Sequence, residues 1–197
     1  MRKIKTILFL FVLALISVNQ ARALTTLDFE GVPTTYYRWI GNHNLYDYYP
    51  GLEFGPDATI LDKEIGGGYN GLYYPPHSGN AVLSSDSTWY IRVDFVDSPA
   101  NYVETWYTSY YTFYLDAYDS SDTLLASSTG PSNLGTNSLI SVSADNIAYV
   151  KLHDSENYFT IDDFGYETGA VIPAPGSILL CGIGVGFVGW LRRRRAL

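Results

Sequence analysis

The chain has 197 residues and a formal net charge of −8 at pH 7, with 18 tyrosines and a single cysteine. Between residues 24 and 170, a stretch called the body below, 20 acidic residues face only four basic ones, which gives this part a formal charge of −16. So acidic a body excludes electrostatic binding to nucleic acid. The cysteine, Cys181, lies outside the body, which excludes both an internal disulfide and a thiol enzyme.

The N-terminus has the pattern of a secretory signal peptide, residues 1–23. A basic start, an apolar run and a small-x-small motif follow one another: Arg2, Lys3 and Lys5, residues 6–18, and Ala21 with Ala23. Signal peptidase accepts only small side chains at the two alanine positions, so we expect cleavage after Ala23 and export of the body. The alternative is an uncleaved anchor helix.

The body has a strand pattern throughout. Alternation is clearest at residues 88–96, where Trp89, Ile91, Val93 and Phe95 share one face, and at residues 110–118, where Tyr111 is expected to point inward. Strands are predicted at 26–29, 81–84, 88–96, 102–107, 110–118, 123–127, 139–142, 147–152 and 158–166. No stretch of the body has a sustained helical period, so the sequence predicts one all-β sandwich domain over residues 24–167.

Between residues 36 and 79 the alternation gives way to Gly, Pro, Asn and Tyr, which is typical of functional or loosely ordered loops. Flat rings beside amides and carboxylates suit sugar binding. The candidate glycan-binding residues are Tyr36, Tyr37, Trp39, Tyr46, Tyr48, Tyr49, Tyr69, Tyr73 and Tyr74. The alternative is that these rings cap the open ends of the sandwich.

Carboxylates gather near both ends of the domain, at Asp28 and Glu30 and at Asp162 and Asp163. If the terminal strands pair, these groups converge, and a hard cation such as calcium would relieve their repulsion. A structural calcium is therefore the one cofactor the sequence suggests. The alternative is a set of solvated edge carboxylates.

Catalytic motifs are missing from the sequence. It has no Gly-x-Ser-x-Gly elbow, no His-Glu-x-x-His pair and no phosphate-binding loop, and its three histidines are isolated. Glu53 and Glu104 could be nominated as a glycosidase pair, but nothing marks them above other carboxylates. We predict that the protein is not an enzyme, and a secreted glycoside-active enzyme is kept as an alternative.

The C-terminus carries a second apolar segment. Residues 168–172 are expected to form a linker, and the apolar residues 177–191 are followed by Arg192, Arg193, Arg194 and Arg195. A helix over 177–191 reaches about 22 Å, short of a hydrocarbon core of roughly 30 Å. The arginines orient it with the tail in the cytoplasm and the body outside.

This end resembles the PEP-CTERM sorting signal, a Pro-x-Pro motif followed by a short Gly- and Leu-rich helix and an Arg cluster. The matching segment is residues 173–197, which begins with Pro173, Ala174 and Pro175; Ala174 stands where the family usually has Glu. The resemblance implies processing by an exosortase-like membrane enzyme in a Gram-negative bacterium that makes exopolysaccharide, with transient residence in the inner membrane. A plain C-terminal membrane anchor is the alternative.

The body is similar to secreted jelly rolls of the galactose-binding and carbohydrate-binding kinds. The residues that carry this resemblance are 27–31, 76–80, 113–119 and 161–164. It implies a jelly-roll sandwich whose first and last strands lie side by side, often with a structural calcium near the chain ends. The sequence thus predicts an exported cell-surface or extracellular-matrix protein with weak glycan binding. A purely structural matrix or envelope component is the alternative.

Overall fold

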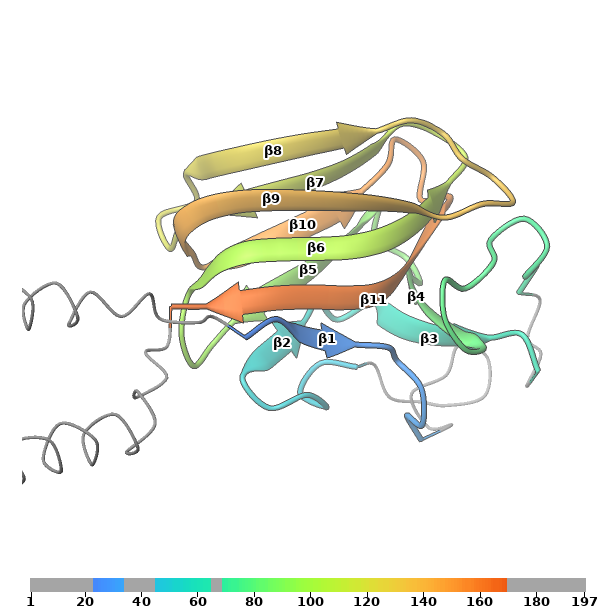
Figure 1. The fold of residues 1–197 in the computed structure, drawn as a ribbon, viewed down its shortest axis with the longest axis horizontal. Helices are drawn as coiled ribbons and strands as arrows, with labels where there is room; N and C mark the ends of the chain where they lie inside the picture. The colour runs from blue at the N-terminus through green and yellow to red at the C-terminus, as the bar shows by residue number, and fades with distance from the viewer. Residues whose placement is uncertain (1–22, 34–44, 65–68, 170–197) are drawn as a thin grey trace, which may run out of the picture. The chain divides into compact units, whose positions relative to one another are not determined.

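The computed structural model describes residues 23–33, 45–64 and 69–169, and these ranges contain strands and no helix (Figure 1). The strands are β1 (Thr25–Leu27), β2 (Leu52–Phe54), β3 (Ala58–Asp62), β4 (Ala81–Ser85), β5 (Tyr90–Phe95), β6 (Ala100–Ser109), β7 (Phe113–Tyr118), β8 (Leu124–Gly130), β9 (Ser138–Ile147), β10 (Tyr149–His153) and β11 (Phe159–Thr168). The predicted signal peptide up to Arg22 and the predicted sorting segment 173–197 lie outside the described residues.

The strands form two sheets in which every pairing is antiparallel. One sheet has the order β3-β4-β11-β6-β9, with β1 also pairing to β11, and the other has the order β2-β5-β10-β7-β8. Apolar side chains from both sheets, such as Leu83, Leu115 and Phe164, are fully buried in one core cluster. The domain is therefore a β-sandwich, which confirms the predicted all-β class.

Alternation along the strands explains which residues form the core. In β5, Ile91, Val93 and Phe95 are buried while Arg92 and Asp94 between them are partly exposed. Pairs of this kind recur because successive side chains of a strand point to opposite faces. Each fully buried Leu, Val or Phe contributes roughly 1.5–3 kcal/mol.

Two of the predicted strands begin too early in the sequence. Trp89 was expected to point inward but is 63% exposed, because β5 begins only at Tyr90. Tyr111 was also expected inward but is 37% exposed, because β7 begins at Phe113. The short strands β2 and β3 lie within the segment that was predicted to be irregular.

The last strand, β11, joins the ends of the domain. Along one edge it pairs with β6 over most of its length. Along the other edge it pairs with β4 at Ile161 and then with β1 from Phe164 to Tyr166 (Figure 1). The predicted pairing of the first and last strands is confirmed. The change of partner coincides with a register shift after Asp162 and with a φ of 45° at Asp163.

No helix among the described residues is long and apolar enough to cross a membrane. The apolar segment 177–191 belongs to the part of the chain outside those residues.

Candidate functional site

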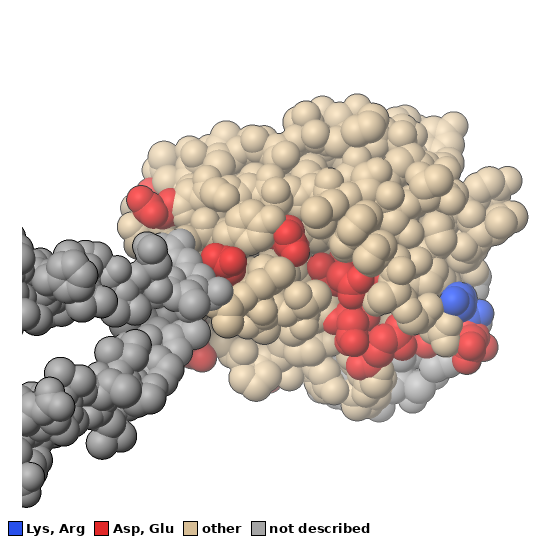
Figure 2. Space-filling model, in the orientation of Figure 1, with Lys and Arg blue, Asp and Glu red and all other residues tan. Residues whose placement is uncertain are grey.

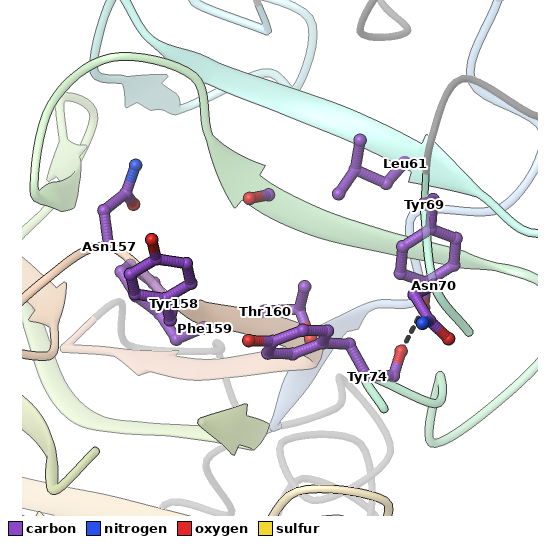
Figure 3. A pocket seen from close by; sticks show the side chains of 9 residues that line it. Leu61, Tyr69, Asn70, Tyr74, Asn157, Tyr158, Phe159 and Thr160 are labelled. Carbon is purple, nitrogen blue, oxygen red and sulfur yellow. Dashed lines mark hydrogen bonds between the residues drawn. The ribbon is translucent and has the colours of Figure 1, made fainter. Parts of the chain in front are cut away.

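A hollow of about 270 Å³ opens on the outer face of the six-stranded sheet. Because Ile60, Leu83 and Ile161 belong to the core, their neighbours along β3, β4 and β11 point outward. Figure 3 shows these neighbours at the base of the hollow, with tyrosines on either side. The lining residues are Leu61, Tyr69, Asn70, Tyr74, Ser84, Asn157, Tyr158, Phe159 and Thr160.

One wall of the hollow is a turn that Asn70 holds in place. Its side-chain oxygen accepts the N–H of Leu72 at 3.1 Å, and its carbonyl accepts the N–H groups of Tyr73 and Tyr74 at 3.1 and 3.0 Å. The hydroxyl of Tyr69 donates to the carbonyl of Tyr74. The turn therefore fixes the positions of both lining tyrosines.

Burial raises the pKa of both phenols of this wall further above the physiological range. It is the main reason that the pKa of Tyr69 is raised, and the negative charges of Asp162 and Asp62 add to it. The pKa of Tyr74 is raised by burial first and then by Asp154. Both rings therefore retain their O–H groups at physiological pH.

The opposite wall is a turn built on Asp154, which is almost fully buried. Its Oδ1 accepts the N–H groups of Glu156 and Asn157 at 2.9 and 2.6 Å. Its Oδ2 accepts the hydroxyl of Ser109 at 3.0 Å. These bonds hold Asn157 at a φ of 64°, in the left-handed region, and present Tyr158 at the surface.

Asn157 supplies an unsatisfied acceptor to the hollow. Its Oδ1 atom is buried and has no hydrogen-bond partner among the described residues, whereas its Nδ2 donates to the carbonyl of Ser85 at 3.4 Å. A buried carbonyl oxygen without a partner costs free energy, so a shift of the Asn157 side chain that lets a ligand hydroxyl donate to it would be favoured.

A second hollow, of about 250 Å³, adjoins the first at Tyr158 and is also lined by Tyr110 and Tyr111. The three rings are 55%, 52% and 37% exposed, and their centroids lie 4.8 to 6.3 Å apart. The N–H of Tyr110 donates to the carbonyl of Tyr158 at 2.9 Å, which ties the two segments together. The two hollows are called the tyrosine cleft below.

The sequence analysis found part of this cleft. Tyr69 and Tyr74 line it, and Tyr73 lies on the same turn without lining it. Tyr110, Tyr111 and Tyr158 were not among the candidates. The signal available was the Tyr110–Tyr111 pair, which follows a strand and precedes the next alternating segment.

The other candidate rings lie elsewhere. Tyr48 and Tyr49 pack edge to face against each other, at 4.9 Å, and against the core. Tyr46 is 45% exposed, and its hydroxyl donates to Glu53 of β2 at 2.8 Å. Tyr36, Tyr37 and Trp39 lie outside the described residues.

The predicted carboxylate site occupies the junction where β11 changes partner. Oε1 of Glu30 accepts the N–H groups of Asn80 and Ala81, both at 2.7 Å. Oδ1 of Asp28 accepts the N–H of Glu30 at 3.1 Å. Oδ2 of the buried Asp162 accepts the N–H of Ser78 at 2.8 Å. On the face seen in Figure 2, acidic side chains gather near β1 and β11.

These carboxylates accept hydrogen bonds from backbone N–H groups and are not grouped around a common point. Among the described residues, no three His, Cys, Asp or Glu side chains are grouped so that they could hold a metal ion. The expected convergence on one cation is therefore not found in this part of the chain. One oxygen each of Asp28 and Glu30 and both oxygens of Asp162 accept N–H groups instead. Burial raises the pKa of Asp162 to about 6.

His77 and Ser78 lie at the same junction. Nδ1 of His77 is 2.5 Å from Oδ2 of Asp163, and its ring stacks on Trp106 with centroids 3.7 Å apart. The Ser78 hydroxyl donates to Oδ1 of Asp163 at 2.9 Å, so its proton is directed at a carboxylate and not at the imidazole. A nucleophile and base pair would need the second arrangement.

The nominated glycosidase pair is split between the two sheets. Glu53 lies on β2 and Glu104 on β6, and each accepts a tyrosine hydroxyl, from Tyr46 at 2.8 Å and from Tyr102 at 2.6 Å. Their strand neighbours Leu52 and Val103 belong to the core, so the two carboxylates point away from it on opposite faces of the sandwich. They cannot flank one glycosidic bond.

No known family model matches this chain, and no curated protein matches it. Among solved structures, the K2 cleaved adhesin domain of Lys-gingipain aligns at 16% identity and a TM-score of 0.45, over 75% of this chain and 99% of that one. A family 29 carbohydrate-binding module from Piromyces equi aligns at 10% identity and a TM-score of 0.42, over 80% and 97%. A glycoside hydrolase family 43 arabinoxylan arabinofuranohydrolase from Bacillus subtilis, at 19% identity and a TM-score of 0.36, is covered over only 23% of its chain.

Proposed function

We propose that the body binds glycans without acting on them, and that the tyrosine cleft is its binding site. The observation that carries this proposal is the first hollow itself. It has a tyrosine on each wall, and its lining residues include Asn157, whose buried amide oxygen is unpartnered among the described residues. Hollows of this composition are suited to a ligand that is apolar on one face and rich in hydroxyls at its edge.

A sugar ring has these properties. Its C–H face can lie against Tyr74 or Tyr158, and its equatorial hydroxyls can donate to Asn157 or accept from a tyrosine hydroxyl. Both walls are preformed by the hydrogen bonds of Asn70 and Asp154, so little ordering entropy is lost on binding. The open, shallow geometry supports weak affinity.

Non-catalytic binding is supported by the positions of the candidate catalytic groups. In the described part of the chain, no Asp or Glu lines either hollow. Retaining and inverting glycosidases require two carboxyl groups on either side of the scissile bond. A secreted glycoside-active enzyme is therefore the weaker candidate.

Export and sorting form the second part of the proposal. The N-terminal pattern ending at Ala23 supports cleavage by signal peptidase, and residues 173–197 support processing by an exosortase-like membrane enzyme. The protein would then reside at the cell surface or in the extracellular matrix of a Gram-negative bacterium, associated with exopolysaccharide, after transient anchoring in the inner membrane. Intact-mass analysis of the native protein tests this, since a tail that still ends at Leu197 would contradict it.

The strand order supports a jelly roll as the finer description of the sandwich. From β4 to β11 the neighbours are β4-β11-β6-β9 in one sheet and β5-β10-β7-β8 in the other. Two four-stranded sheets with this pairing are what two interlocked Greek keys produce. The fold alone does not assign an activity, and the tyrosine cleft is needed for that.

The test is glycan binding by the full chain, purified in detergent, on an array of polysaccharides and oligosaccharides. Tyr158→Ala should abolish binding, because Tyr158 lines both hollows. Tyr46→Ala is the matched control, since Tyr46 is similarly exposed but lies beside Glu53 of β2. Loss of binding in the control alone would move the site to the loops before β2. A silent array with wild-type protein would favour a purely structural matrix component.

A further inference from the structure

Resting on the proposed function, we infer that the tyrosine cleft binds an uncharged polysaccharide along its chain, with at least two consecutive sugar residues, and rejects uronate-bearing or sulfated glycans. Two independent features carry this inference. One is the division of the cleft into two hollows that share a wall. The other is the distribution of charge around it.

The first feature is size. The two hollows have volumes of about 270 and 250 Å³. Each alone falls below the range of about 300–1,000 Å³ that is typical of small-molecule sites, whereas together they lie within it. A ligand that fills the cleft must therefore extend from one hollow into the other.

The shared wall is Tyr158, which is half exposed and lines both hollows. On one side it faces the first hollow. In Figure 3 the phenol of Tyr74 extends across this hollow toward the side of Tyr158. On the other side its ring centroid is 6.3 Å from Tyr110 and 6.2 Å from Tyr111. Aromatic surfaces on both sides of one residue are suited to successive rings of a chain.

The chemistry of the two hollows differs. The first contains amides, with the unpartnered oxygen of Asn157 among them. The described residues that line the second are all tyrosines. We therefore expect the first hollow to fix the orientation of one sugar through hydrogen bonds, and the second to add stacking area for the next sugar with little selectivity.

The second feature is charge. Among the residues that the structure describes, no Lys, Arg or His lines either hollow. Carboxylate charges reach tyrosines of both hollows. Burial is the main reason that the pKa of Tyr69 is raised, and the charges of Asp162 and Asp62 raise it further. Burial likewise comes first for the raised pKa of Tyr111, and the charge of Glu156 comes second. The cleft therefore lies in a negative field.

Lys63, a basic side chain close to the 69–74 turn, is directed elsewhere. It lies beside this turn, since its β-carbon would be 3.4 Å from a β-carbon added to Gly71. Its Nζ, however, donates to the carbonyl of Gly79 at 3.0 Å. An anionic sugar would enter this site without a compensating cation, and its carboxylate or sulfate would be repelled. An uncharged sugar meets no such barrier.

The experiment measures affinity by calorimetry for the full chain with glycans that the array identifies, as a length series from one sugar to six. Uncharged and uronate polysaccharides are compared at low and high salt. We expect at least a tenfold gain in affinity from one sugar to the longer oligomers. We also expect at least tenfold weaker binding of alginate and polygalacturonate than of neutral glucans or mannans.

Two variants assign the gain to the second hollow. Tyr111→Ala should remove most of the gain in affinity with ligand length, and Tyr74→Ala should weaken the binding of all lengths alike. Equal affinity for one sugar and for its oligomers would overturn the two-residue part of the inference. Equal or tighter binding of uronates would overturn the charge part. A wild-type protein that binds no glycan at all would instead refute the proposed function, so the two failures are distinguishable.

Discussion

Asp154 holds Tyr158 through both of its carboxylate oxygens: the N–H of Tyr158 lies 3.2 Å from Oδ1 and 3.2 Å from Oδ2. A buried carboxylate thereby fixes a half-exposed ring four residues further along the chain. The same carboxylate accepts two more backbone N–H groups and the hydroxyl of Ser109. Since Tyr158 is the wall that the two hollows share, the geometry of the cleft depends on a group that no ligand would touch.

Replacing this carboxylate should cost both stability and binding. Asp154→Ala leaves several N–H groups of the 154–158 turn unsatisfied, so we expect the free energy of unfolding to fall by about 2–4 kcal/mol. Urea titration measures it. Asp145→Ala is the control, because Asp145 is exposed on β9, and its effect should stay within about 0.5 kcal/mol. If Asp154→Ala unfolds at the urea concentration of the wild type, the turn does not depend on this carboxylate.

Gly130, at the end of β8, should not tolerate a side chain. A β-carbon at this position would lie 2.0 Å from the hydroxyl oxygen of Tyr107, which is buried and stacked on Phe113 with centroids 4.5 Å apart. The Tyr107 hydroxyl also donates to the carbonyl of Pro131 at 3.0 Å, so the ring cannot move without breaking that bond. We expect Gly130→Ala to destabilise the protein by about 1–3 kcal/mol.

The matched control for Gly130 is Gly55. A β-carbon there would meet Arg92 at an ordinary 3.5 Å. Thermal unfolding of both variants provides the measurement. A Gly130→Ala protein that melts together with Gly55→Ala would show that Tyr107 has room to shift.

Local alternation carried enough information to predict much of the sandwich. Each of the nine predicted strands overlaps a strand of the structure, because the body alternates apolar and polar residues wherever one strand face is buried. The short strands β2 and β3 were missed because Gly55 and Pro56 separate them and turn residues surround them. Trp89 and Tyr111 were misplaced because an alternating pattern does not reveal where a strand begins.

The cleft was harder to predict for a different reason. Tyr110 and Tyr158 lie far apart in the sequence and meet because Phe159 pairs with Ser109 across β11 and β6. Register of this kind is set by tertiary packing and is not encoded in local spacing. The role of Asp154 has the same origin, since its partner Ser109 is on another strand. By contrast, Tyr69 and Tyr74 share one turn, and a local cluster was enough to nominate them.

Stability should depend on pH through Asp162. Burial raises its pKa in the folded protein to about 6, from an ordinary value of 3.8. The protonated form is therefore favoured by folding, and its stabilising contribution is complete below about pH 4 and is lost as the pH rises through about 6. The loss amounts to roughly 2–3 kcal/mol at about 1.4 kcal/mol for each pKa unit.

Asp162→Asn isolates this contribution, since the amide cannot ionise. The unfolding free energy of the variant, measured in urea from pH 4 to 7, should fall less steeply with pH than that of the wild type. The comparison uses slopes because Asn also alters the hydrogen bonds to Ser78 and Asp163, at 2.8 and 2.7 Å, at every pH. Parallel slopes for the two proteins would mean that Asp162 is ionised across this range.

Chelation should leave the melting temperature of the protein unchanged. The carboxylates of Glu30 and Asp162 accept backbone N–H groups at 2.7 and 2.8 Å, so these N–H groups already supply the positive charge density that a calcium ion would bring to the junction. We expect superimposable melting curves in EDTA and in millimolar calcium. A midpoint several degrees higher in calcium would show instead that a cation binds the folded state. Asp28→Asn would then identify its place, because Asp28 accepts only one N–H, from Glu30, and its other oxygen could reach a metal.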